Sequence, residues 1–296
     1  MKKIPPMAAN AEKGMMGIRQ MPRLWMKVLL DAKGLLPEGY TAQGVGADGV
    51  VIRTLGLDTQ EVLTYLRGER PTYPAFEAWV RQKAGDSVPE ATRSRLNDEL
   101  DAGRQAPERR AELLRAAGVA DNGAWTKEQV NRWDDYGEFH RHLVASDGAG
   151  PAHVPPLAAC FEPGMMGIVQ MPRMWMKVLL DAKGLLPEGY TAQCVGFDGV
   201  VVEGLGLDRA QVLDHLRRNL PPYPAFEAWV EEKAGGPIPV DVKRAINERI
   251  LGYEARPERR AELLGAAGVA DDGTWTKMVD INRWDDYGEF HRHLLA

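Results

Sequence analysis

Charged side chains at helical spacing are the first candidates for chemistry in this chain. Arg23, Lys27 and Asp31 are spaced i, i+4 and i+8, which places them along one flank of a helix. Arg23 falls in the first turn, where free backbone N–H groups and the helix dipole favour an anion over a cation. A bound carboxylate or phosphate would offset that cost, so the stripe is a candidate anion site. The alternative is a solvated face with a Lys27–Asp31 pair.

A second candidate is a pair of adjacent acids flanked by aromatic residues. The motif is Arg132-Trp-Asp-Asp-Tyr136, and it occurs again as Arg283-Trp-Asp-Asp-Tyr287. Adjacent carboxylates can supply a general acid or base, and their mutual repulsion would raise the pKa of one of them if both were buried. The alternative is that Asp134 or Asp135 caps the last helix while Trp133 packs.

Two further patterns favour structural roles. The rings of His140 and His142 diverge on a helix, so no metal site is predicted there. Gly14-Met-Met-Gly17 lacks the length and the Lys-Ser/Thr ending of a phosphate-binding loop. Its methionines, together with Trp25, could line an adaptable apolar pocket or fill the core.

These candidates lie in a segment that the chain contains twice. The stretch from Gly14 to Asp31 returns as Gly164 to Asp181, and the match continues to the C-terminal end of each copy. A repeat of this size indicates a duplicated domain, because solenoid and propeller units are shorter. We predict a first repeat at residues 1–144, a linker at 145–153 and a second repeat at 154–296, packed around an approximate twofold axis as a fused dimer.

Within each copy the element signals are mainly helical. Pro22 and Gly34 bracket a first helix whose apolar face includes Trp25, so Trp25 and its counterpart Trp175 are predicted to be buried. Capping-box-like starts predict helices after Asp58 and Asp208, and Pro-led segments predict three more at 74–80, 89–104 and 107–114. The last segment, 125–143, is expected to be helical with an interruption at Gly137.

One segment of each copy has the signal of a strand. Asp48-Gly precedes the β-branched run Val50-Val-Ile52, which is typical of a tight turn that enters a short strand. The predicted fold class is therefore α+β, mainly α, with two homologous helical domains that each contain one small β element.

The composition limits the classes of partner and compartment. Hydrophobic residues make up 44% and charged residues 27% of the 296 residues, as in an ordinary soluble globular protein. The net charge of -5 argues against a nucleic-acid partner, and no apolar run reaches the roughly 18 residues of a membrane helix. The first residues lack an apolar stretch, so no signal peptide is expected. Cys160 and Cys194, opposite Asn10 and Gly44 of the first copy, are predicted to be free thiols in a reducing cytoplasm.

Three motifs in each copy resemble those of a bacterial family. In the first copy they are Gly17-Ile-Arg-Gln-Met-Pro-Arg-Leu-Trp-Met-Lys27, Gly34-Leu-Leu-Pro-Glu-Gly-Tyr40 and Asp48-Gly-Val-Val-Ile-Arg-Thr-Leu-Gly-Leu57. On these motifs each copy resembles the bacterial domain of unknown function numbered 5069. Members of that family open with a Leu-Pro-Arg-like step and have a Lys four residues after the Arg.

The resemblance implies a soluble bacterial protein and supplies no reaction. The polar pair of the family corresponds to Arg23 with Lys27, and to Arg173 with Lys177 in the second copy. The chain departs from the family where an acid usually precedes the Lys, because methionine stands at both of those positions. A role that needs an acid beside the Lys is therefore in doubt.

Two classes of function remain open. The first is a cofactor-independent enzyme that moves a proton on a small polar or anionic organic molecule, as an isomerase, lyase or cyclase does. The second is a binding protein that sequesters a ligand in a Met/Trp-lined cleft, as in self-resistance. Buried charges that converge on a pocket would favour the enzyme, and a wholly apolar cleft with its charges in solvent would favour the binding protein.

The enzyme hypothesis assigns the same roles in both copies. The expected partner is a small molecule, and neither a cofactor nor a metal ion is predicted. The catalytic candidates, predicted to line one cavity per copy, are Lys27 with Asp135 and Lys177 with Asp286. The substrate-binding candidates, which would hold an anion or shape the pocket, are Arg23, Trp25, Trp133, Tyr136, Arg173, Trp175, Trp284 and Tyr287.

Overall fold

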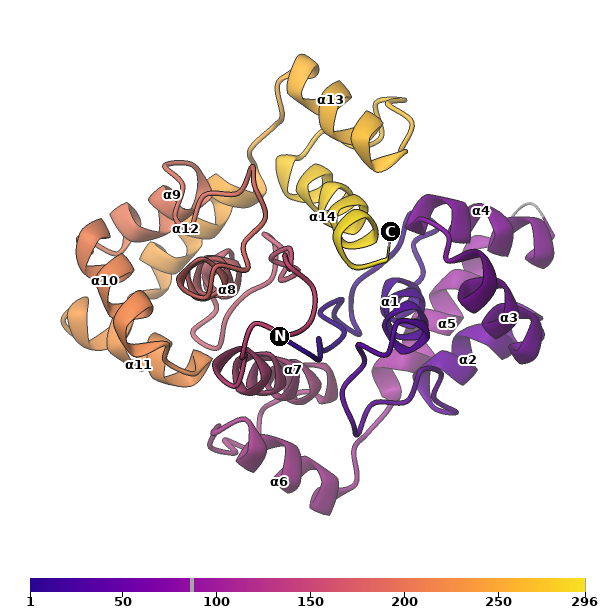
Figure 1. Cartoon of the computed structure of the whole chain (residues 1–296), viewed down its shortest axis with the longest axis horizontal. Helices are drawn as coiled ribbons and strands as arrows, with labels where there is room; N and C mark the ends of the chain where they lie inside the picture. The colour runs from indigo at the N-terminus through magenta and orange to yellow at the C-terminus, as the bar shows by residue number, and fades with distance from the viewer. Residues whose placement is uncertain (86–87, 296) are drawn as a thin grey trace. The chain divides into compact units, whose positions relative to one another are not determined.

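The chain folds into two compact helical units. A computed structural model describes residues 1–85 and 88–295, and within it the first unit comprises Met1–His142 with Leu295 and the second Leu143–Leu294. In the described part of the chain, β structure is limited to isolated bridges such as Lys13 with Arg19 (Figure 1). Mainly α structure is therefore confirmed, and the α+β class with a small β element in each copy is wrong.

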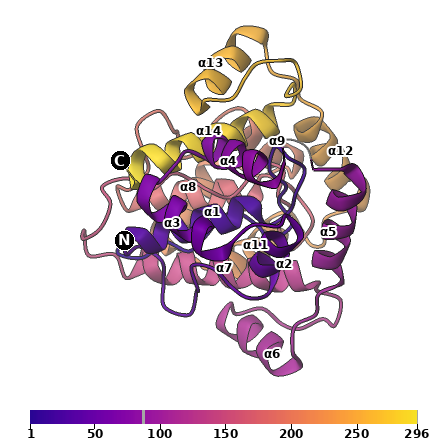
Figure 2. The same ribbon diagram turned by 90° about the vertical axis from the view of Figure 1, so that its right-hand side faces the viewer.

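In the first unit a buried helix is surrounded by shorter ones. The helices are α1 (Met21–Ala32), α2 (Ala47–Thr54), α3 (Thr59–Glu69), α4 (Tyr73–Ala84), α5 (Glu90–Ala102), α6 (Pro107–Ala116) and α7 (Lys127–Val144). Helix α1 contacts α2, α3 and α4, α5 packs on α2, and α6 lies beside α7 (Figures 1 and 2). The N-terminal segment, residues 1–20, leads into α1 and supplies part of the cavity wall described below.

The second unit repeats this order of elements. Its helices are α8 (Met171–Ala182), α9 (Phe197–Gly204), α10 (Arg209–Asn219), α11 (Tyr223–Lys233), α12 (Val240–Leu251), α13 (Pro257–Ala267) and α14 (Met278–Leu294). Helix α8 contacts α9, α10 and α11, α12 packs on α9, and α13 packs along α14 (Figure 1).

Helix α1 is buried along almost its whole length. Pro22 starts the helix and Gly34, at φ 66°, follows its end, as predicted. Trp25 and Trp175 are both 0% exposed, which confirms their predicted burial. The polar residues on the same helix are buried too, with Arg23 5% and Lys27 7% exposed. Charges held this deep require partners within the protein.

The predicted strand after Asp48-Gly is instead helix α2. The β-branched residues Val51 and Ile52 form the buried face of this helix. Asp48 lies in its first turn, where its carboxylate accepts the backbone N–H of Gly44 at 2.7 Å and suits the positive end of the helix dipole. Burial against α1 and α5 outweighs the weak strand preference of Val and Ile, because propensity is a minor term beside tertiary packing.

The predicted interruption at Gly137 is also absent, since α7 runs through it. A Cβ at this position would lie 3.1 Å from the Cα of Ala117, so glycine permits close packing of α7 and is not a break. The predicted capping boxes are confirmed: the Asp58 carboxylate accepts the N–H of Glu61 at 2.8 Å, and Asp208 does the same for Gln211.

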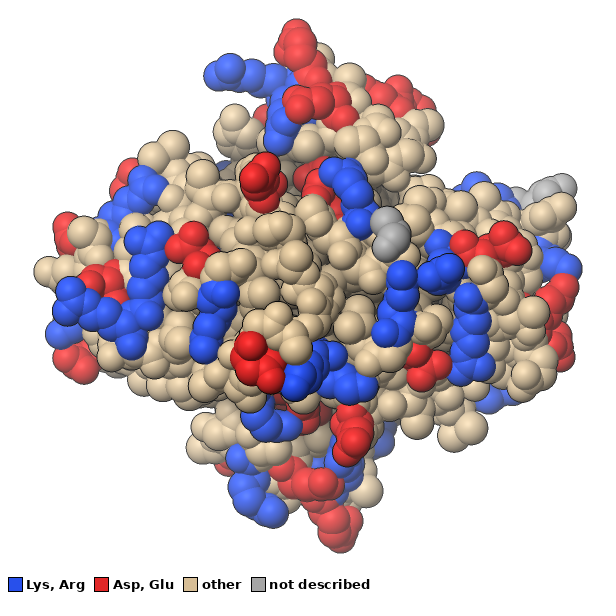
Figure 3. Space-filling view, in the orientation of Figure 1, with Lys and Arg blue, Asp and Glu red and all other residues tan. Residues whose placement is uncertain are grey.

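The surface is highly charged but of mixed sign. Lys and Arg side chains alternate with Asp and Glu on the face seen in Figure 3, and many form pairs one helical turn apart, such as Arg109 with Glu112. The predicted linker around Gly148 is exposed. Among the described helices, none has the length and apolar character needed to cross a membrane.

Candidate functional site

Each unit contains a large cavity, and corresponding residues border the two cavities. Its volume is about 820 Å³ in the first unit and about 660 Å³ in the second. The wall is formed by the first helix, the loop after it, the start of the second helix and the last two helices of the unit. The charged and hydroxyl-bearing residues that line both cavities are Arg23/Arg173, Lys27/Lys177, Glu38/Glu188, Tyr40/Tyr190, Thr41/Thr191, Arg109/Arg259, Glu112/Glu262, Asp134/Asp285, Glu138/Glu289 and Arg141/Arg292.

A bidentate ion pair joins the two ends of the first unit at this cavity. Arg23 on α1 donates from Nη1 and Nη2 to the carboxylate of Asp135 on α7, at 2.7 and 2.8 Å. The same guanidinium donates to the carbonyl oxygens of Pro6 at 2.6 Å and Ala8 at 2.8 Å, and Tyr40 donates its hydroxyl to Asp135 at 2.8 Å. Asp135 is 1% exposed. These hydrogen bonds compensate the buried charges and fix the chain around the site.

A second buried ion pair lies one turn further along α1. Lys27 donates to Asp48 at the start of α2, and Gln20 donates from Nε2 to the other oxygen of that carboxylate at 2.7 Å. Burial lowers the pKa of Lys27, while Asp48 acts in the opposite direction. The alternative Lys27–Asp31 surface pair does not form, because Asp31 pairs with Arg67 at 2.9 Å. Both cations predicted to hold an anion therefore have carboxylate partners inside the protein.

The second unit reproduces both pairs. Arg173 donates to Asp286 at 2.6 and 2.7 Å and to the carbonyl oxygen of Pro156 at 2.5 Å. Lys177 pairs with Asp198, which accepts Gln170 Nε2 at 2.7 Å. Lys27 and Asp135 line one cavity, whereas Lys177 lines the second cavity and the carboxylate of Asp286 lies behind Arg173.

The carboxylate best placed for proton transfer is the neighbour of the predicted one. Asp134 lines the first cavity, and its pKa is raised to about 7 by burial and then by the negative charges of Asp135 and Glu138, with Arg109 and Arg141 acting in the opposite direction. Asp285 in the second unit has a pKa raised to about 7 for the same reasons. Adjacent acids were the sequence signal for this shift. The sequence did not show which of the two would be held by an arginine.

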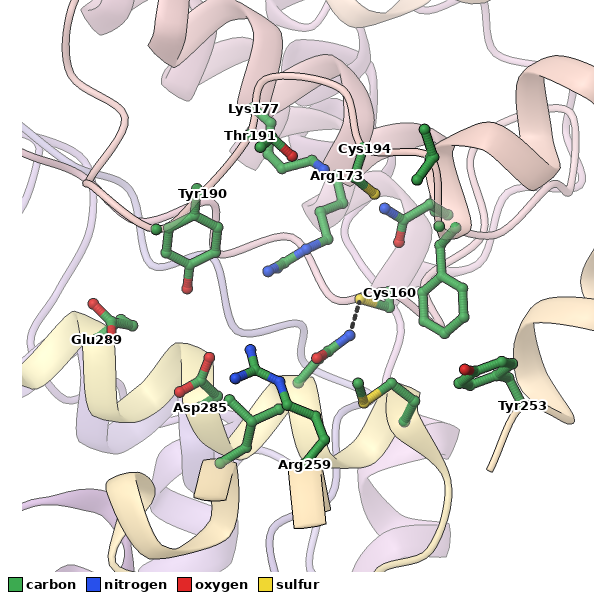
Figure 4. A pocket seen from close by; sticks show the side chains of 18 of the residues that line it. Cys160, Arg173, Lys177, Tyr190, Thr191, Cys194, Tyr253, Arg259, Asp285 and Glu289 are labelled. Atoms are coloured by element: carbon green, nitrogen blue, oxygen red, sulfur yellow. Dashed lines mark hydrogen bonds between the residues drawn. The ribbon is translucent and has the colours of Figure 1, made fainter. Parts of the chain in front are cut away.

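A phenol completes the charged side of each cavity. Burial, followed by the charge of Asp135, raises the pKa of Tyr40 well above its ordinary value, so its hydroxyl stays protonated. The pKa of Tyr190 is raised in the same way. Figure 4 shows Tyr190, Asp285, Glu289 and the guanidinium of Arg259 around one side of the second cavity. Sequence reasoning did not include Tyr40 among the candidate site residues and placed Asp48 in a tight turn, so it missed both.

The aromatic residues predicted to shape the pocket lie in the core. Trp25 donates its indole N–H to the carbonyl oxygen of Pro71 at 2.9 Å, and Trp175 does so to Pro221. Trp133 and Tyr136 are 3% and 1% exposed. Their counterparts, Trp284 and Tyr287, are 4% and 1% exposed. These six aromatic side chains are buried, and none of them lines either of the two cavities.

The Gly-Met-Met-Gly motif encloses a different buried acid. The backbone N–H of Met16 donates to Glu77 at 2.9 Å, and Tyr73 donates its hydroxyl to the same carboxyl group. A Cβ on Gly14 would overlap with that carboxyl group and with the Tyr73 hydroxyl, so glycine is needed there. Burial raises the pKa of Glu77 to about 7, against the effect of these hydrogen bonds. This acid is outside the cavity and holds the loop to α4.

In the described part of the chain, no three His, Cys, Asp or Glu side chains are grouped closely enough to hold a metal ion. The cavity acids Glu112 and Glu138 instead pair with Arg109 and Arg141, at 2.9 and 2.7 Å. The site therefore offers a titrating carboxylate, a fixed pattern of ion pairs and one neutral hydroxyl-bearing ring for chemistry on a bound molecule.

Comparisons with known proteins leave the family open. No family model, no curated protein and no solved structure matches this chain. The resemblance of each copy to the domain of unknown function numbered 5069 therefore stays a prediction.

Proposed function

We propose that the protein is a cofactor-independent enzyme that transfers a proton on a small polar organic molecule, in an isomerase, lyase or cyclase type of reaction. Asp134 in the first cavity and Asp285 in the second are the proton-transferring groups. The observation that supports this most strongly is a cavity-lining carboxylate with a pKa of about 7 in both units. A general base is most effective when its pKa lies near the working pH.

The remaining residues divide into positioning and substrate-facing groups. Arg23 holds Asp135 in a bidentate ion pair and thereby fixes the position of this carboxylate beside Asp134. Tyr40 and Arg109 face the same cavity as Asp134. An arginine that shares the cavity with the base suits an oxygen of the substrate on which negative charge develops. Arg23 and Lys27 act through their partners and do not bind the anion themselves.

Buried charge at the cavity favours an enzyme over a sequestering protein. A sequestering cleft for an apolar ligand would place its charged residues in solvent. Here two ion pairs per unit, both nearly inaccessible, adjoin the cavity. Holding them there is costly without strong hydrogen bonds, and their arrangement around a titrating carboxylate fits preorganised electrostatics.

Solvent deuterium exchange tests this proposal across a whole pool of candidate substrates. The protein is incubated in D2O with a mixture of small hydroxy, oxo and amino acids, and mass spectrometry follows deuterium at carbon or a change of isomer. We expect incorporation in at least one compound, and its loss in the double variant Asp134→Asn with Asp285→Asn. Asn preserves the shape and removes the base.

A matched control uses exposed acids outside the cavity. The double variant Glu61→Gln with Asp214→Asn changes two surface carboxylates and should retain the full exchange rate. If a pool member binds with equal affinity to the native protein and the Asn double variant and never acquires deuterium, the protein sequesters its ligand. That result would contradict the enzyme proposal.

A further inference from the structure

The two cavities have the same charged side but differ on the opposite side. In the first unit that side contains Asn10, Gly44 and Ala47. The second unit has Cys160, Cys194 and Phe197 at the corresponding positions. The second cavity also gains Tyr253, which stands where the first unit has Gly103.

An aromatic pair forms part of this altered wall. The rings of Phe197 and Tyr253 meet edge to face with centroids 5.8 Å apart. Tyr253 is 48% exposed, although large aromatic side chains are usually more buried. Figure 4 shows Tyr253, Cys160 and Cys194 together, across the cavity from Tyr190 and Glu289. An aromatic group placed here would cover exposed apolar surface and continue the edge-to-face packing.

A buried acceptor in the same wall has lost its donor. In the first unit the side-chain oxygen of Gln20 accepts Asn10 Nδ2 at 2.8 Å. Cys160 replaces Asn10 in the second unit, and the corresponding oxygen of Gln170 has no donor among the residues that the structure describes. Gln170 is 2% exposed and lines the cavity. A buried acceptor of this kind favours a ligand that brings an N–H or O–H group.

From these observations we infer that the second cavity is a subsite for an aromatic molecule with a neutral N–H or O–H donor, and that the first cavity takes a fully polar molecule. The inference rests on the proposed function for the charged side of the cavity, where the reaction takes place. It adds the class of substrate that the opposite wall recognises. Phe197 and Tyr253 contact the ring, and Gln170 accepts the donor. The two units then act on different members of one class of polar compound.

The two cysteines provide a direct reporter of occupancy. Cys160 and Cys194 are the only cysteines of the chain, and both line the second cavity. Burial raises the pKa of Cys160, so the more exposed Cys194 is the faster thiol toward a disulfide reagent. The reaction of Cys194 with 5,5′-dithiobis(2-nitrobenzoate) in the native full chain therefore reports whether the altered wall is covered, and peptide mass spectrometry assigns the modified thiol.

Benzamide is the probe, because it combines one ring with an N–H donor. At a concentration about ten times its Kd, which we expect in the millimolar range, benzamide should slow modification of Cys194 about tenfold. Acetamide and cyclohexanecarboxamide at the same concentration should have less than a twofold effect. Equal protection by either of these amides, or none by benzamide, would overturn the inference.

Variants separate this inference from the proposed reaction. The double variant Phe197→Ala with Tyr253→Gly has the residues of the first unit at these two positions. It should lose the protection of Cys194 by benzamide. The Asp134→Asn/Asp285→Asn protein should retain it, because thiol modification requires no turnover. Loss of protection in that Asn variant would contradict a ring subsite that is independent of the base. A folded reciprocal variant, Asn10→Cys with Gly44→Cys, Ala47→Phe and Gly103→Tyr in a Cys194→Gly background, should show benzamide protection of the thiol introduced at position 44.

Discussion

The walls of the two cavities agree on one side and differ on the other. On the charged side, Arg23, Lys27, Tyr40 and Asp134 each have an identical counterpart. On the opposite side, asparagine, glycine and alanine residues of the first unit correspond to cysteine and aromatic residues of the second unit. The difference follows from physical coupling, because a residue in a buried ion pair cannot change alone without leaving its partner charged and unpaired.

The opposite wall is free of that constraint. Cysteine in place of Asn10, as at Cys160, removes the hydrogen bond to Gln20 and gives Asn131 a sulfur acceptor in place of an oxygen, and it leaves all ion pairs intact. Such a change costs little stability and alters the chemistry facing a ligand. The comparison therefore divides each cavity into a part that must be kept for the fold and a part that can change specificity. The following predictions test that division, beginning with the largest expected effect.

Breaking the buried Arg–Asp pair should destabilise either unit strongly and equally. Arg23→Met leaves Asp135 buried without its bidentate partner, and Arg173→Met does the same to Asp286. We expect a loss of about 3–5 kcal/mol of unfolding free energy in the affected unit. Hydrogen-exchange mass spectrometry in denaturant, which resolves the two units separately, measures it.

The exposed ion pairs of the same helices provide matched controls. Arg67→Met removes the partner of Asp31, and Arg217→Met that of Asp181, in pairs that are more than a third exposed. Each should cost less than about 1 kcal/mol. A cost for Arg23→Met as small as for Arg67→Met would show that the cavity ion pair is dispensable and would remove the proposed reason for its retention.

The buried acids behind the Gly-Met-Met-Gly loops should give both units the same pH dependence. The pKa of Glu77 and that of Glu227 are raised by burial to about 7 in the folded protein, from an ordinary value of 4.5. The folded state binds a proton more tightly, so the stabilisation is complete below about pH 4.5 and is lost as the pH rises through 7. Glu77→Gln should therefore add about 1–3 kcal/mol at pH 8 and change little at pH 4.5.

Urea unfolding of Glu77→Gln and Glu227→Gln between pH 4.5 and 8 measures this effect. Each substitution should reduce the pH dependence of the unfolding free energy in its own unit and leave that of the other unit unchanged. A profile in which native stability rises from pH 4.5 to 8, with no change in slope for either variant, would mean that these acids are ionised in the folded protein at neutral pH.

Exchanging Asn10 and Cys160 between the two units should change the stability of each unit slightly and in opposite directions. Cys160→Asn supplies the donor that the Gln170 oxygen lacks and should stabilise the second unit by about 1 kcal/mol. Asn10→Cys removes that donor in the first unit and should cost about the same. Thermal unfolding of the two variants, with each unit followed by hydrogen exchange, compares them. Destabilisation by both would show that packing outweighs the hydrogen bond.

The helices could be predicted wherever local signals and tertiary packing agree. Pro22 and Gly34 mark the ends of α1, and the carboxylates of Asp58 and Asp208 form the predicted caps, because these signals act within one turn. Helix α2 could not be predicted, since its β-branched residues are helical only in contact with α1 and α5. The role of Gly137 depends on the backbone of Ala117, which packs against it. Sequence periodicity gives no information about that contact.

The candidate site was predictable in its residue types but not in its pairings. Arg23, Lys27 and the acid pair were identified from spacing, and both cations line the cavity. Their partners, Asp48 and Asp135, are 21 and 112 positions away from them in the chain, so only the fold selects them. The fold pairs Arg23 with Asp135 and leaves Asp134 outside this ion pair, where burial raises the pKa of Asp134 to about 7. The tryptophans were misplaced because helical spacing shows that a residue is buried, not whether it adjoins a cavity.

The central claim is that Asp134 and Asp285 titrate near neutral pH, and a direct measurement of their pKa values tests it best. Carbon-detected NMR of protein labelled with 13C at the Asp side-chain carboxyl carbon follows each group from pH 4 to 9, with Asp134→Asn and Asp285→Asn assigning the two signals. We predict that both titrate at about 7. Titration of both near the ordinary value of 3.8 would contradict the proposed role of these carboxylates.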